Sequence, residues 1–437
     1  MTGREYRMTN HEYRTSRPGD TGRSPRFITL ARSRVHRSAS VFVIRYSLFL
    51  LVSLAPASPA SAQSFDLFPI RQRPVDYFGE ATRNPLAEFD ARLESGEVTL
   101  SYREGSPLGY LPSLLSALAI PVESQVLTFS AAARNAQLVS AERPRALYFN
   151  DEIYVGYVPG SPEIELATFD EEKGIVFFTL RQLAQDKPRL DRDENCTQCH
   201  VHQRNTRGVP GLVLGTMLVE PPAKRSELVP LLLATPWSER FGTWYLTGEF
   251  GGNGHRGNGL GEPVTKPAER FSSEELAKRV DLGRYPSPHS DGTALLLLAH
   301  QSNVQNEVTR LLYERAFRRP TEATELRLAR ELLFADEAAF QPGWKGSTRF
   351  ADLYISTGKA DADGRSLREL DLSTRLMKWA VSDQISSRAV QSLPDEVRER
   401  LVRRIESALK GDVDAIPINR SEAVRSATRD LLRERGF

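Results

Sequence analysis

The chain has 437 residues, of which 40% are hydrophobic and 26% charged, with two cysteines and a formal net charge of +2. This composition predicts a globular protein with a sizeable core, and so few cysteines exclude a disulfide-rich scaffold. The basic balance comes from residues 1–62, which hold ten arginines and three acidic residues. The other 375 residues carry 48 basic and 53 acidic side chains, a charge of −5, which argues against nucleic acid as a partner.

The N-terminal segment has the pattern of a secretory signal. An apolar run over residues 41–54, interrupted by Arg45, precedes Ala60-Ser61-Ala62, a small-residue cleavage pattern. The apolar part is shorter than the roughly 20 residues that a transmembrane helix needs. We therefore expect residues 1–62 to be a signal peptide with a basic leader, cleaved before Gln63. The mature protein is expected to be periplasmic or secreted, without an integral membrane segment.

Residues 63–190 predict an α+β region. Helical apolar spacing is present over residues 85–94 and 110–120, and strand-like alternation over 98–102 and 125–129. Four β-branched or aromatic runs separated by turn residues then predict an antiparallel β-meander, at 145–149, 153–158, 163–168 and 175–180.

Residues 191–437 predict a mainly helical region. The stretch 208–261 is rich in glycine and is expected to be irregular. Helical spacing then recurs in five segments, at 294–317, 322–334, 366–385, 395–410 and 423–437. The predicted fold class is therefore α+β, with an N-terminal antiparallel β-meander that leads into a cysteine-containing segment and a mainly α-helical C-terminal half.

The cysteine-containing segment is Cys196-Thr-Gln-Cys-His200, which holds both cysteines of the chain. Two cysteines separated by two residues and followed by histidine form the attachment pattern of a c-type haem. In that chemistry each thiol is joined to the porphyrin, and His200 is an axial ligand of the iron. Two alternatives stay open. A redox or structural disulfide has no need of His200, and a zinc site needs a fourth ligand beyond the three in the motif.

Several further segments resemble a family of secreted single-haem c-type cytochrome proteins, common in planctomycetes and related bacteria. They occur in the family's order, at 145–151, 154–160, 196–200 with 209–211, 241–248, 255–258, 290–301 and 366–372. The resemblance implies one haem c and an extracytoplasmic location, and it implies no particular reaction. The chain departs from the family at Gln305, where relatives often carry histidine, and at 379–384, which replaces a more aromatic run.

Ligand chemistry and the small number of histidines and methionines limit which residues can surround the iron. A ligating imidazole usually donates its second N–H to a carbonyl, and Pro210 lies at a suitable distance along the chain. For the sixth coordination position we consider His255, in a glycine-rich loop, and His300, on an apolar helix. Met217, Met377 and an open or water-bound iron are the remaining alternatives, and both methionines fit core packing better.

Three further residues, Trp244, Tyr245 and Arg256, are candidates to line the haem edge or pair with its propionates, although core packing and surface charge explain them nearly as well. The function expected first is electron transfer through one covalent haem, with an unidentified redox partner and the haem-maturation machinery as partners. The alternative is a peroxidase-like, haem-dependent oxidoreductase with an open distal site, where His255 or His300 moves protons. A haem-bearing binding or sensory module is the third hypothesis.

Overall fold

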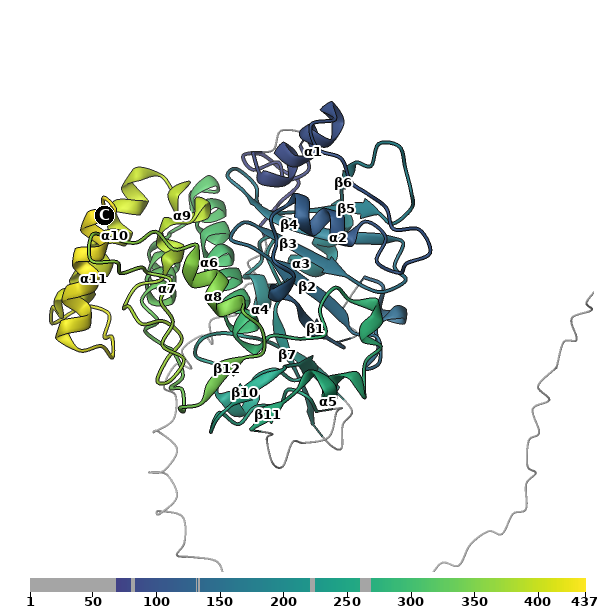
Figure 1. Cartoon of the computed structure of the whole chain (residues 1–437). Helices are drawn as coiled ribbons and strands as arrows, with labels where there is room; N and C mark the ends of the chain where they lie inside the picture. The colour runs from purple at the N-terminus through teal and green to yellow at the C-terminus, as the bar shows by residue number, and fades with distance from the viewer. Residues whose placement is uncertain (1–67, 80–82, 131, 133, 221–224, 260–268) are drawn as a thin grey trace, which may run out of the picture. The chain divides into compact units, whose positions relative to one another are not determined.

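The largest sheet is antiparallel and has the strand order β6-β5-β4-β3-β2-β1-β9 in the computed structural model (Figure 1). Its centre is the predicted meander, which is thereby confirmed. The strands of the meander are β2 (Arg145–Phe149), β3 (Ile153–Tyr157), β4 (Glu163–Asp170) and β5 (Gly174–Arg181). One edge is extended by β1 (Val126–Thr128) and β9 (Trp244–Tyr245), and the other by β6 (Leu190–Arg192).

The structure describes residues 68–79, 83–130, 132, 134–220, 225–259 and 269–437. Within these ranges, the side chains of residues 218–220 and 225–227 are not described. The signal peptide expected at 1–62 lies outside these residues. Contacts group Gln63–Phe437 into one compact unit. The two strands at the ends of the sheet, β6 and β9, belong to this unit. In the part of the chain that the structure describes, every helix is too short or too polar to cross a membrane.

The two faces of the sheet are covered by different helices. Side chains alternate along a strand, so Tyr154 and Tyr157 of β3 lie on opposite faces. The Tyr157 hydroxyl donates to the carbonyl of Pro107, beside α2 (Leu111–Ala117), and α1 (Pro85–Ser95) packs against β4. On the other face, the Gln301 side chain of α6 (Gly292–Ala316) donates to the Tyr154 hydroxyl at 2.8 Å. The long helix α6 therefore covers the face that carries Tyr154.

The C-terminal helices pack outward from α6. Figure 1 shows α6 between the sheet and α7 (Glu322–Leu332), α10 (Asp395–Lys410) and α11 (Glu422–Glu434). Most of α6 is buried, including polar residues such as Asn306 and Thr309, as expected for a helix enclosed by a sheet and other helices. The helix predictions for 85–94, 110–120, 294–317, 322–334, 395–410 and 423–437 are confirmed within a few residues.

Two predicted elements are wrong. Residues 98–102 form no strand, because their amides bond locally: Val98 N–H donates to Arg92 O and Ser101 N–H to Ser113 Oγ. Residues 366–385 form turns and the short η6 (Asp383–Ser386) rather than one helix. Asp371 accepts bonds from the backbone and hydroxyls of Ser373 and Thr374, which competes with helix formation.

The glycine-rich part of the second region, expected to be irregular, contains short strands. A hairpin is formed by β7 (Gly215–Glu220) and β8 (Arg225–Pro230). A separate small sheet has β10 (Gly248–Phe250) between β11 (Arg270–Phe271) and β12 (Trp344–Gly346). The remaining α-helices are short: α3 (Thr197–His200), α4 (Gln203–Thr206), α5 (Ser273–Ala277), α8 (Phe350–Ser356) and α9 (Arg388–Gln391).

Candidate functional site

The cysteine segment folds as one short helical stretch, η3 (Glu194–Cys196) followed by α3. Asp193 begins it, because its carboxylate accepts from the Asn195 N–H at 2.9 Å. Cys196 and Cys199 are three residues apart and so lie on the same side of the helix. Cys196 is half-buried against the core, Cys199 is exposed, and no disulfide joins them. Both thiols are therefore presented along one side of a single helical turn.

His200 is held by a ring hydrogen bond and an aromatic contact. Its Nδ1 donates to the carbonyl oxygen of Gly211 at 2.8 Å, and its ring centroid lies 4.5 Å from that of Phe177 on β5. Burial lowers the pKa of His200, and the Gly211 carbonyl opposes this shift. With the proton on Nδ1, the lone pair of the imidazole is on Nε2, the atom that would face a metal.

The carbonyl that accepts this bond was expected to be that of Pro210 and is that of the next residue. Val201 and Pro210 form an antiparallel bridge, which places Gly211 opposite His200. The Gly211 N–H accordingly donates to the His200 carbonyl at 2.9 Å. The spacing along the chain was nearly right, and the register of the bridge decides which residue is the partner.

The helix α6 fixes the loop that carries Gly211. The Asn306 side chain accepts from Leu212 N–H and donates to Leu212 O, both at 2.8 Å. A side chain at position 211 has no room, since a Cβ there would lie 2.6 Å from Asn306 Oδ1 and 2.9 Å from Thr206. The orientation of His200 is thus tied to the most buried helix of the fold.

A charged pair, missed by the sequence analysis, lies on the sheet near the motif. Arg145 of β2 and Glu165 of β4 form an ion pair with side chains only 19% exposed, across Gly156 of the strand between them. Burial raises the pKa of Cys196 to about 11; Glu165 adds to this rise, whereas Arg134 and Arg145 oppose it. Arg145 begins β2 and Glu165 lies within β4, and both share the face of Phe177. Charged residues that are largely buried in a strand pair indicate an ion pair, a pattern that could have been recognised.

His255 lies in an aromatic cluster far from His200. Its ring is 4.5 Å from that of Phe250 and 5.8 Å from that of Phe241, and Gly257 N–H donates to its Nδ1. Only 2% of the residue is exposed, and burial lowers its pKa to about 4. The adjacent Arg256 N–H donates to Arg240 O, close to β9, and β9 is five strands away from β5. At about 4.8 Å per strand, this corresponds to roughly 24 Å.

His300 also makes its contacts away from the cysteine segment. Its Nε2 lies 2.7 Å from Ser382 Oγ and its ring packs on Phe334, so it faces α7. Asn306, six residues later on α6, contacts the Gly211 loop, and a six-residue separation turns a helix position by about 120°. Two axial ligands of one iron lie roughly 4 Å apart, with metal–nitrogen distances near 2 Å. The structure therefore brings neither His255 nor His300 to His200.

The contacts of His300 include a second arrangement that the sequence analysis missed. Its Nδ1 lies 3.8 Å from the Glu331 carboxylate, so that Ser382, His300 and Glu331 follow one another as in a hydrolase triad. Ser382 is 0% exposed, however, and its Oγ also accepts from Gln384 N–H. A nucleophile without access to substrate has no catalytic use, so this is a buried structural network.

The other candidates are placed around β9. Trp244 donates through Nε1 to Gly215 O, the Tyr245 hydroxyl donates to Ala141 O, and Arg256 donates to Ser238 O. Each of the three side chains therefore bonds to a backbone carbonyl and helps to hold the fold around β9. Met377 is fully buried, as core packing predicts, whereas Met217 is half-buried on β7, whose partner β8 packs against α4. The Met217 N–H donates to the Gly242 carbonyl at 3.1 Å, however, which places Met217 beside the start of β9, the strand close to the His255 loop.

Comparison with protein-family models, with curated proteins and with solved structures finds no match for this chain. Among the residues that the structure describes, no group of three or more His, Cys, Asp or Glu side chains is placed to hold a metal ion. The geometry of the Cys196–His200 segment and its surroundings is therefore the best indication of what the protein does.

Proposed function

We propose that this protein is an extracytoplasmic c-type cytochrome that transfers electrons through one haem, bound covalently by Cys196 and Cys199. His200 is the axial ligand in this proposal. The observation that carries it is the hydrogen bond from His200 Nδ1 to the Gly211 carbonyl. Metal-bound histidines have this arrangement, because a carbonyl at the second nitrogen fixes both the tautomer and the plane of the ring.

The thiols fit the same chemistry. They lie one helical turn apart beside His200, with Cys199 accessible and Cys196 against the core. When bound, the haem would supply an iron that changes between ferrous and ferric states, with a potential set by its axial ligands, burial and nearby charge. Phe177 packs against the imidazole, and the Arg145–Glu165 pair supplies charge close to it. These residues would position the ligand and tune the potential.

A haem-dependent oxidoreductase is the second candidate, and one observation favours it. Among the described residues, neither His255 nor His300 is placed to be a second imidazole ligand. The iron would then be either open to small molecules or bound by a side chain other than these two histidines. Carbon monoxide binding by the reduced protein separates these cases: fast binding favours the enzyme, and a six-coordinate, low-spin spectrum favours electron transfer.

The central claim is tested by expressing the full chain together with haem-maturation machinery. The proposal requires a haem that stays with the protein after acid–acetone extraction. Cys199→Ser should prevent attachment at one position and His200→Ala should remove the axial ligand, while Gln198→Ala, at an exposed position between the cysteines, should change neither. If the wild-type haem extracts freely, or the spectrum of His200→Ala equals that of the wild type, the proposal is wrong.

A further inference from the structure

A cavity of about 380 Å³ lies at the end of the β2–β3 hairpin, away from the cysteine segment. It is lined by the β2–β3 turn, the loop after α8, residues 366–368, η6 with the start of α9, and Arg435 near the C-terminus. Arg145, next to the motif, and Phe149, next to this turn, are at opposite ends of β2, about 13 Å apart at roughly 3.3 Å per residue. The cavity is therefore separate from the proposed haem site.

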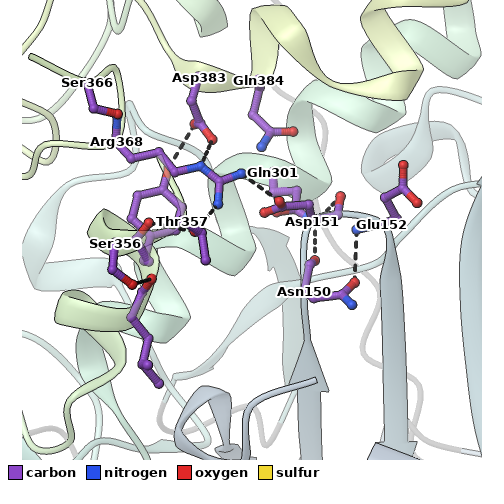
Figure 2. A network of polar contacts seen from close by, with 12 residues as sticks. Asn150, Asp151, Glu152, Gln301, Ser356, Thr357, Ser366, Arg368, Asp383 and Gln384 are labelled. Atoms are coloured by element: carbon purple, nitrogen blue, oxygen red, sulfur yellow. Dashed lines mark hydrogen bonds and ion pairs between the residues drawn. The ribbon is translucent and has the colours of Figure 1, made fainter. Parts of the chain in front are cut away.

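One wall of the cavity is a network around Arg368 (Figure 2). The Arg368 guanidinium lies 2.6 Å from Asp151 and 3.1 Å from Asp383, and it also donates to the Thr357 hydroxyl. Asp383 accepts a further bond from the Tyr354 hydroxyl at 2.8 Å. Arg368 and the two carboxylates thus satisfy one another and form a fixed polar wall, which leaves other groups of the lining for a ligand.

Two lining residues have buried polar atoms without a partner. Gln384 is only 4% exposed, and its Oε1 accepts no hydrogen bond. Arg435 donates through Nη2 to the Lys359 carbonyl, while its buried Nη1 donates to nothing. A buried donor or acceptor without a partner is costly, so such atoms in a cavity wall indicate an absent ligand or water.

The unused groups are divided by kind. Gln384 and Glu152 lie on one side of Arg368 (Figure 2). Thr357 and Ser366, whose hydroxyls accept hydrogen bonds from Arg368, lie on the other side. Burial raises the pKa of Glu152, and Arg388 opposes this rise; Arg388 is itself paired with Glu171 and Glu88. Lys359 follows Thr357 by two residues, and Arg435 is bonded to its carbonyl. Among the lining groups outside the ion pairs, the acceptors Gln384 and Glu152 therefore lie at one end of the cavity and the cations Arg435 and Lys359 at the other.

We propose that this cavity binds a small zwitterion, an amino acid or dipeptide, with its ammonium on Gln384 and Glu152 and its carboxylate on Arg435 and Lys359. An ammonium group only donates hydrogen bonds and a carboxylate only accepts them, which matches the separation of the unused groups. The volume lies in the range of small-molecule sites. This inference is independent of the haem.

Titration calorimetry on the full-length protein at pH 7 tests the proposal with glycine, glutamate and alanyl-alanine. At least one should bind saturably, and its N-acetylated and its amidated forms should each bind roughly tenfold more weakly, because each lacks one charged hydrogen-bonding group. Inorganic phosphate and glucose serve as a simple anion and a neutral polyol. Failure of all three zwitterions, or equal binding of the blocked forms or of phosphate, overturns the proposal.

Variants locate the binding. Glu152→Gln and Arg435→Gln should each weaken binding by about tenfold, since each removes one charge of the ligand's pair. Arg403→Gln is the matched control, because Arg403 is exposed on α10 and lies outside the cavity. Unfolding temperatures show whether each variant folds. If a cavity variant does not fold, the comparison of free and blocked ligands on the wild type still decides, and unchanged affinity in folded variants refutes the assignment.

Discussion

His200 and Gly211 hold one another through two hydrogen bonds, from the imidazole Nδ1 to the Gly211 carbonyl at 2.8 Å and from the Gly211 N–H to the His200 carbonyl at 2.9 Å. Because Asn306 bonds both polar backbone groups of the next residue, Leu212, this pairing is anchored to α6. The direction of the His200 ring therefore depends on the core of the protein, as well as on the short helix that carries it.

Enlarging Gly211 should disturb this anchor. In Gly211→Ala the new Cβ would meet Asn306 and Thr206 well inside normal contact distance, so we expect a loss of about 1–3 kcal/mol in the free energy of unfolding, measured in urea. The haem-loaded variant should also show an altered spectrum, because the proton acceptor of His200 moves. Gly283→Ala is the control, since its Cβ meets only Asp281 at 3.4 Å. Equal stability of the two variants would contradict this account.

Glu165→Gln should raise the reduction potential of the haem. The carboxylate lies close enough to influence both Cys196 and His200, and a negative charge stabilises the ferric form. One unit charge acting over about 15 Å at an effective dielectric constant of about 20 is worth roughly 1 kcal/mol, or about 40 mV for one electron, which sets the scale of the expected shift. Asp191→Asn on β6, where the carboxylate is 62% exposed, should shift the potential much less. A lower potential in Glu165→Gln would contradict the assignment.

The fold was predictable where local patterns decide it. The meander over 145–180 has β-branched or aromatic runs separated by strong turn residues, and the helix at 395–410 has regular spacing. The prediction failed at 366–385, where apolar spacing suggests a helix and Asp371 forms a competing turn. Strand β9 joins the sheet by pairing with β1, with Leu127 opposite Tyr245, and local periodicity does not reveal a pairing so distant in sequence.

The candidate site was predictable only where its residues are adjacent in sequence. Cys196, Cys199 and His200 come from one motif, whereas the acceptor of His200 depends on the register of the Val201–Pro210 bridge. Glycine density around His255 suggested close approach to a flat cofactor, and the neighbours of its ring are instead Phe241, Phe250 and Trp344. The small number of histidines limited the candidates for the sixth ligand of the iron. Which side chains lie close to His200 is decided by tertiary packing, which the sequence does not reveal.

Substitution of His300 should affect stability and leave the haem spectrum unchanged. His300→Ala removes a buried ring that packs on Phe334 and leaves Ser382 Oγ with only the Gln384 N–H as a hydrogen-bond partner. We expect a loss of about 2–4 kcal/mol in the free energy of unfolding. Ser382→Ala should cost less, because only one hydroxyl is lost. A change from a low-spin to a high-spin spectrum in His300→Ala would instead show that His300 is a ligand, contrary to its position here.

The secreted protein should begin at Gln63. Residues 60–62 have the small-residue pattern of a signal-peptidase site, and covalent haem attachment by this motif requires export. N-terminal analysis of the protein from the periplasm or medium checks this directly. Ala62→Phe should block cleavage there, whereas Ser61→Phe, at the position between the two small residues, should be tolerated. A mature chain that retains the basic leader would contradict the proposed location.

His255 should make the protein less stable in mild acid. Its pKa in the folded protein, about 4, lies below the value of about 6.5 expected in the unfolded chain, because burial disfavours the charged ring. Between these values the unfolded chain binds more protons, so the free energy of unfolding falls as the pH decreases from 6.5 toward 4. Between pH 7.5 and pH 5 this contribution amounts to about 2 kcal/mol.

His255→Asn tests this dependence, because asparagine can still accept the Gly257 N–H bond and does not titrate in this range. The smaller side chain leaves space among the aromatic rings and should lower stability at both pH values. The difference between the two values is therefore the measured quantity, and it should shrink by about 2 kcal/mol relative to the wild type. Urea unfolding at pH 7.5 and pH 5 gives both numbers. If the variant keeps the full wild-type difference, His255 is already neutral or already charged in both states, and its burial among Phe241, Phe250 and Trp344 does not control the acid response.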